Sequence, residues 1–226
     1  MKTNVLLFTI MSSIIFLCIQ CKKENNDSIK EGVKRGEIKL SNAELNIIPY
    51  MVNDSIVFKD SLGNSHTFKV KSRNLTFHRT LKDGGTDITT DYYDIENLSV
   101  WLKDNNDYYI RFELEAPLPN YCSNQWINKN YFVIYVEPPY NSTPPNSRNT
   151  FLNYIDTTDF YYTLYGVSIP YHSSMTIINK TFSSVYELIS YDANGSDDYI
   201  QKIYYKVSKG IVGYQMKSGV KWYLEN

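Results

Sequence analysis

The feature that most constrains the fold is an alternating pattern on both sides of the turn sequence Asp104-Asn105-Asn106-Asp107. Apolar residues occupy every second position before and after this turn. They are Leu98, Val100, Leu102, Ile110, Phe112 and Leu114. Period-2 alternation around an Asn/Asp turn is typical of a β-hairpin with one buried face and one solvent-exposed face. The sequence therefore predicts two antiparallel strands here, and a sheet of more strands to cover the buried face.

Strand signals recur along the rest of the chain, and 21 tyrosines favour strands because a pleated surface accommodates aromatic rings. Residues 131–136 form a continuous apolar run, which indicates a strand buried on both faces. Further strands are expected at 55–60, 66–71, 74–80, 185–191, 200–207, 211–216 and 220–224. The last three form a compact C-terminal meander. We therefore predict an all-β fold with an antiparallel sheet, as a sandwich or a partly open barrel.

The segment 138–146 contains four prolines, which cannot donate to a sheet ladder. It is either a long surface loop or a linker, so a break between two subdomains at 138–149 is one interpretation. Residues 21–36 are polar and charged, and we interpret them as a flexible tether. The β domain is expected to span residues 37–226.

The N-terminus has the form of an export signal. After Lys2 the chain is apolar from Val5 to Ile19, which is shorter than the roughly 20 residues of a membrane-spanning helix. A polar stretch follows Cys21 directly, as in a secretory signal. We predict a signal peptide at residues 1–20; an uncleaved anchor or a buried helix is the alternative.

The residues Leu17-Cys18-Ile19-Gln20-Cys21 resemble a bacterial lipobox. That resemblance implies a diacylglycerol on the Cys21 thiol, cleavage before Cys21 and acylation of the new N-terminus. Gln20 departs from the small residue usual at this position. Cys18 is the other candidate, but it lies inside the apolar run. Several acyl chains hold a protein on a membrane far more firmly than one chain does.

Composition excludes a nucleic-acid-binding domain and a disulfide framework. Residues 1–20 hold one basic residue and no acid, so the mature chain has 22 basic and 24 acidic residues. A nucleic-acid-binding domain would show clustered basic charge instead. With Cys21 lipidated, Cys122 is the one remaining thiol and cannot form an internal disulfide. We expect it to be a small buried residue rather than a nucleophile.

No motif predicts a catalytic, metal or cofactor site. His66, His78 and His172 lack any metal-ligand spacing. Acidic groups at 83–94 and 192–198 coincide with turns, where Asp and Asn bond the local backbone, and neither fits an EF-hand loop. The sequence contains no nucleophile elbow, phosphate-binding loop or zinc-protease motif.

Aromatic residues on predicted outward faces or loops are the best candidates for ligand contacts: Trp101, Tyr109, Trp126 and Tyr140. Such rings stack on sugars or anchor a protein partner. The alternative is ordinary exposure, since 34 aromatic residues are too many to bury completely.

The stretch from Ile203 to Tyr214, followed by Trp222-Tyr223-Leu224, resembles the ending of many Bacteroidota outer-membrane lipoproteins. Ile48-Pro49-Tyr50 and the segment 54–58 also look like parts of those proteins. The resemblance covers about a quarter of the chain, implies an antiparallel β fold at the outer membrane, and carries no catalytic residues. It leaves the periplasmic and the surface face open.

Three hypotheses follow for the function. The leading one is a non-enzymatic, lipid-anchored envelope protein that binds a glycan or a protein partner. The second is a hydrolase acting on glycans, with two carboxylates brought together by the fold. The third is a structural subunit of an envelope assembly.

Overall fold

The structure is a computed structural model that describes residues 32–81, 91–117, 130–137, 149–156, 159–162, 169–190 and 199–225. The described residues all belong to one compact unit, Gly32–Asn226. Its elements are β1 (Lys34–Ile38), α2 (Asn42–Leu45), β2 (Ser55–Lys59), β3 (Ser65–Leu81), β4 (Tyr92–Lys103), β5 (Tyr109–Glu115), β6 (Asn130–Glu137), β7 (Asn149–Asp156), β8 (Asp159–Tyr162), β9 (Tyr171–Ile177), β10 (Lys180–Ile189), β11 (Ile200–Lys206), β12 (Gly210–Met216) and β13 (Lys221–Leu224).

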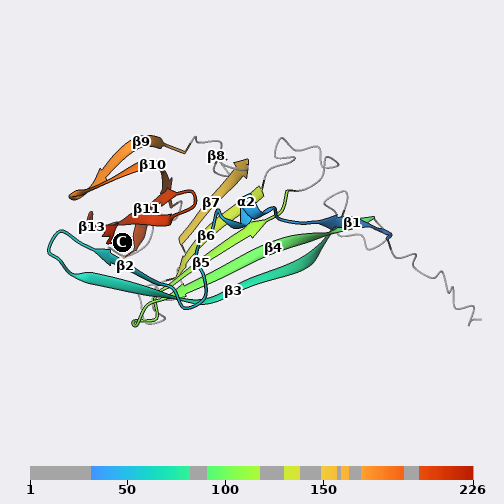
Figure 1. The fold of residues 1–226 in the computed structure, drawn as a ribbon, viewed down its shortest axis with the longest axis horizontal. Helices are drawn as coiled ribbons and strands as arrows, with labels where there is room; N and C mark the ends of the chain where they lie inside the picture. The colour runs from blue at the N-terminus through green and yellow to red at the C-terminus, as the bar shows by residue number, and fades with distance from the viewer. Residues whose placement is uncertain are drawn as a thin grey trace, which may run out of the picture. The chain divides into compact units, whose positions relative to one another are not determined.

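The strands form one antiparallel sheet that curls into a half-barrel (Figure 1). Its order is β8-β7-β6-β5-β4-β3-β2-β13-β12-β11-β10-β9, and β1 pairs in parallel with β4. Two meanders, β2 to β8 and β9 to β13, therefore meet where β2 pairs with β13. The all-β prediction is confirmed, and the fold is the partly open barrel rather than the sandwich.

The two strongest sequence patterns fold as predicted. In the hairpin of β4 and β5, Val100 lies opposite Phe112 and Leu98 opposite Leu114, and all four side chains are buried. The predicted C-terminal meander corresponds to β11, β12 and β13. Alternation and turn residues were sufficient in both cases because each pairing is local.

Three features differ from the sequence prediction. The two strands expected at 66–71 and 74–80 are one strand, β3, which continues through a bulge between Val70 and Ser72. β1 begins at Lys34, within the range interpreted as a tether. The short helix α2 was not predicted, although Ser41 caps it with a capping box in which Ser41 and Glu44 bond each other's backbone N–H.

The core lies inside the curl of the sheet. Tyr205 on β11 reaches Phe132 on β6, with ring centroids 5.5 Å apart, so opposite halves of the sheet pack face to face. The segment after α2 also enters this core. Tyr50 packs on Phe112 at 5.3 Å, and the Tyr205 hydroxyl donates to the carbonyl of Ile47.

Candidate functional site

The open edge of β3 is the largest unpaired feature of the described sheet. β2 pairs with β3 from Ser65 to Lys69. Beyond this point β3 continues beside β4 as far as Leu81, and no described strand pairs with its other edge. Figure 1 shows this part of β3 extending past β2 along the outside of the sheet. An unpaired edge offers N–H and C=O groups to another strand.

The ladder fixes which backbone groups face that edge. In an antiparallel sheet, the N–H and C=O of one residue point to the same neighbour, and successive residues alternate. The amide of Ala116 donates to the carbonyl of Glu96 at 2.9 Å, so the backbone of Glu96 faces the β5 side. Phe77 lies opposite Glu96, and its N–H and C=O therefore point away from β4. Leu75 and Arg79, two residues to either side, share that orientation.

The side chains along this edge are exposed and apolar at its centre. Leu75 is 50% exposed and Phe77 is 46% exposed. Leu75 lies opposite the buried Leu98, so its side chain lies on the core-facing side of the sheet, at the rim. Phe77, two residues further along the strand, lies on the same side. A strand added here would find backbone partners and two apolar side chains together.

β3 is also basic. The span Ser65–Leu81 contains Lys69, Lys71, Arg73 and Arg79 and no acidic residue. Arg73 differs from the others because its guanidinium donates to the carbonyls of Leu45, Ile48 and Tyr50. The Arg79 guanidinium lies 3.8 Å from the ring centroid of Tyr92. Among the described residues, no carboxylate forms an ion pair with Lys69, Lys71 or Arg79.

Two predicted aromatic contacts, Trp101 and Tyr109, come together on the outer face of β4 and β5. Their ring centroids lie 6.4 Å apart in an edge-to-face arrangement. The Arg111 guanidinium lies 5.0 Å from the Trp101 ring and 4.4 Å from the Tyr135 ring on β6. Both predicted residues are partly buried rather than protruding. Their role as ligand contacts stays a prediction.

The remaining predicted positions lie outside the described residues. They are Cys21, Cys122, Trp126 and Tyr140, together with most of the predicted break at 138–149.

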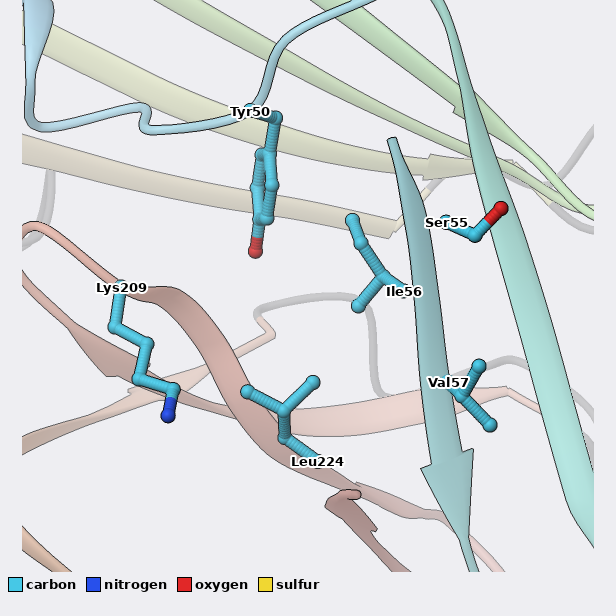
Figure 2. A pocket seen from close by; sticks show the side chains of 6 residues that line it. All are labelled: Tyr50, Ser55, Ile56, Val57, Lys209 and Leu224. Carbon is cyan, nitrogen blue, oxygen red and sulfur yellow. The ribbon is translucent and has the colours of Figure 1, made fainter. Parts of the chain in front are cut away.

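A small cavity opens where β2 and β13 diverge. The backbone hydrogen bond from the Glu225 N–H to the Val57 carbonyl is the last one between the two strands. Beyond it lies a cavity of about 140 Å³ between β2, the end of β13 and the turn that follows β11 (Figure 2). It is lined by Tyr50, Ser55, Ile56, Val57, Lys209 and Leu224. None of these carries a carboxylate, so this cavity lacks the acid pair of a glycosidase.

His66 bridges two buried groups. Its Nδ1 lies 2.6 Å from the Tyr214 hydroxyl and its Nε2 lies 2.8 Å from an Asp104 carboxylate oxygen. The other Asp104 oxygen accepts from the backbone N–H groups of Asn106 and Tyr108 and thereby holds the β4–β5 turn. Burial raises the pKa of Tyr214 well above its usual value. The hydrogen-bond partners of the imidazole are groups that fix the fold, and no serine or cysteine of the described ranges hydrogen-bonds to it.

His172 belongs to a surface charge ladder. The Glu187 carboxylate accepts from Lys202 Nζ at 2.6 Å and lies 3.2 Å from His172 Nε2. Burial alone would raise the pKa of Glu187, but its bonds to Lys202 and His172 outweigh burial and lower it. This ladder ties β9, β10 and β11 together.

No group of three or more metal-ligating side chains occurs among the described residues. Asp91 and Asp94, from the first acidic group, pair with Arg35 at 2.6 Å and with Lys34 at 2.6 Å. The second acidic group lies outside the described residues.

Comparison with protein-family models, with curated proteins and with solved structures finds no match for this chain. In the part of the chain that the structure describes, no helix is long and apolar enough to span a bilayer.

The open edge of β3 was not predicted from the sequence, although the basic composition of this strand is visible there. Seventeen residues with four cations and no acid are unusual in a chain with nearly balanced charge. The open edge itself depends on β2 being much shorter than β3, and strand lengths of partners are not encoded locally.

Proposed function

We propose that this chain is a lipid-anchored envelope protein whose β domain binds an extended segment of a protein partner at the open edge of β3. The observation that carries the proposal is the outward-facing backbone of Leu75, Phe77 and Arg79. Peptides that add a strand to an exposed edge gain affinity from main-chain hydrogen bonds and specificity from alternate side chains.

The chemistry of the edge defines the partner. The apolar side chains of Leu75 and Phe77 favour apolar residues at two alternate positions of the added strand. The cations Lys71 and Arg79 favour acidic residues at its ends. We therefore propose a segment of about seven residues that alternates beside Arg73 to Arg79, with one acidic end reaching towards Lys71 and the other beside Arg79.

A second copy of this chain is the less favourable occupant. Pairing β3 with β3 would bring two basic, acid-free strands together, and like charges on neighbouring strands are destabilising.

The membrane anchor is the second part of the proposal and rests on the sequence at residues 1–21. We propose a diacylglyceryl group on Cys21 and location at the outer membrane. Metabolic labelling with an acyl probe tests this: Cys21→Ala should abolish labelling and release the chain from membranes. Cys18→Ala is the matched control and should leave both unchanged; labelling that survives Cys21→Ala would contradict the anchor.

Partner binding is tested with a synthetic peptide, Glu-Thr-Val-Thr-Val-Thr-Glu, designed to place its Val residues beside Leu75 and Phe77. Fluorescence polarisation of the labelled peptide should show saturable binding to the purified chain, weakened by salt. The control peptide with Lys in place of Glu should bind much more weakly.

Two variants at Phe77 separate the contribution of its backbone N–H to peptide binding from that of its side chain. Phe77→Pro removes the outward N–H and the ring, whereas Phe77→Ala removes the ring alone. Strand addition predicts that Phe77→Pro weakens peptide binding more than Phe77→Ala. Equal effects of the two variants, or concentration-dependent dimerisation in sedimentation without peptide binding, would refute the proposal.

A further inference from the structure

The cavity between β2 and β13 contains a polar group that the fold buries and leaves half satisfied. Tyr50 is 5% exposed, and its hydroxyl oxygen accepts the backbone N–H of Ile211 at 2.5 Å. Its own O–H has no acceptor among the described residues. Figure 2 shows the Tyr50 hydroxyl directed into the space that Ile56, Lys209 and Leu224 also border.

The Tyr50 hydroxyl is a donor at neutral pH. Burial raises the pKa of Tyr50 well above its usual value, so the proton stays on the oxygen. A buried donor without an acceptor is unfavourable, and an acceptor atom in the cavity would remove that cost.

A cation and an apolar wall complete the lining. Lys209 is exposed at the turn after β11, and none of the described carboxylates pairs with its ammonium group. Ile56 and Leu224 are 7% and 6% exposed, and they form the apolar wall. The cavity therefore joins an O–H donor and a positive charge to a short apolar surface.

The volume limits the size of a ligand. An engineered apolar cavity of about 150 Å³ in another protein holds benzene, which has six non-hydrogen atoms. The present cavity of about 140 Å³ has room for a molecule of similar size.

We propose that this cavity binds a short-chain aliphatic monocarboxylate, with its carboxylate between the Tyr50 hydroxyl and Lys209 and its alkyl chain on Ile56 and Leu224. A butyrate ion has the matching six non-hydrogen atoms. This site is separate from the β3 edge, and its test is independent of partner binding.

The test is a titration of the purified chain with sodium butyrate, followed by calorimetry and by the amide NMR signal of Ile211. That amide donates to Tyr50 and should shift in a saturable manner as the carboxylate accepts from the hydroxyl. Butyramide, which has the same shape without charge, should bind about tenfold more weakly, a ratio equivalent to 1.4 kcal/mol. Acetate should also bind more weakly because it leaves the apolar wall uncovered.

Lys209→Gln should weaken butyrate binding about tenfold and leave folding unchanged, because Lys209 is exposed. Lys221→Gln is the matched control, as Lys221 is also exposed and does not line the cavity. The proposal is overturned if butyrate gives no saturable shift at Ile211. It is also overturned if butyramide binds equally well, or if Lys209→Gln and Lys221→Gln behave alike.

Discussion

Gly210 offers a direct test of how Tyr50 is packed against the turn after β11. Gly210 has φ +85°, in the left-handed region that glycine tolerates best. A Cβ at this position would overlap the hydroxyl and Cζ of Tyr50 and would lie 2.9 Å from its Cε1. Gly219 has a similar φ of +92°, but a Cβ there would meet no atom within 4 Å.

Comparing Gly210→Ala with Gly219→Ala separates the cost of backbone strain from the cost of steric overlap with Tyr50. A non-glycine residue in the left-handed region costs about 1–2 kcal/mol, and this cost applies to both Gly210→Ala and Gly219→Ala. At Gly210 the overlap adds about 1–3 kcal/mol of overpacking. If Tyr50 moves aside, the buried N–H of Ile211 loses its acceptor, at a further cost of about 1–3 kcal/mol. We expect Gly210→Ala to cost about 3–8 kcal/mol and Gly219→Ala about 1–2 kcal/mol.

Urea unfolding followed by circular dichroism measures both values, with the slope of the transition compared to confirm that the unfolded states match. Because domains are stable by only about 5–15 kcal/mol, Gly210→Ala should lower the midpoint strongly or prevent folding. Equal losses in the two variants would refute the reasoning, since they would mean that Tyr50 does not occupy the space beside Gly210.

Three further predictions concern β3 and the charge ladder. Thr76→Pro removes a ladder bond to β4 and should cost about 3 kcal/mol or more, whereas Phe77→Pro removes an N–H that faces the open edge and should cost much less in urea unfolding. Arg73→Met should cost about 2–4 kcal/mol because three carbonyls lose their donor, while Lys69→Met on the exposed face should cost little; equal effects would argue against this role. Glu187 has a pKa lowered in the fold, so its contribution to stability is present above the unfolded pKa of about 4.3 and is lost as pH falls through the folded pKa. Glu187→Gln should therefore be less stable than the parent at pH 7, with the difference closing in thermal melts below about pH 4; a difference independent of pH would contradict this.

The sequence identified the elements whose partners are close in the chain. Leu98, Val100 and Leu102 alternate with residues of the outer face, and their partners lie just across the Asp104 turn, so the register of this hairpin is determined locally. The all-β fold class could be predicted for the same reason, since most neighbouring strands in the sheet are also consecutive in sequence.

The curl of the sheet and the β3 edge could not be predicted, because both depend on contacts between distant residues. The guanidinium of Arg73 reaches carbonyls more than 20 residues away, and Tyr50 meets Ile211 across 161 positions. Nothing in the local pattern indicates either contact. The sequence predicts Trp101 and Tyr109 as outward-facing rings, and the register places them on neighbouring strands, two positions out of direct opposition.

Hydrogen exchange at β3 tests the central claim most directly. In the free chain, the amides of Leu75, Phe77 and Arg79 should exchange rapidly because they face the open edge, while those of Asn74, Thr76 and His78 bond β4 and should be protected. Adding the Glu/Val peptide should protect the first three amides and leave the other three unchanged. Uniform protection along β3 in the free chain, or no gain of protection with the peptide, would contradict strand addition at this edge.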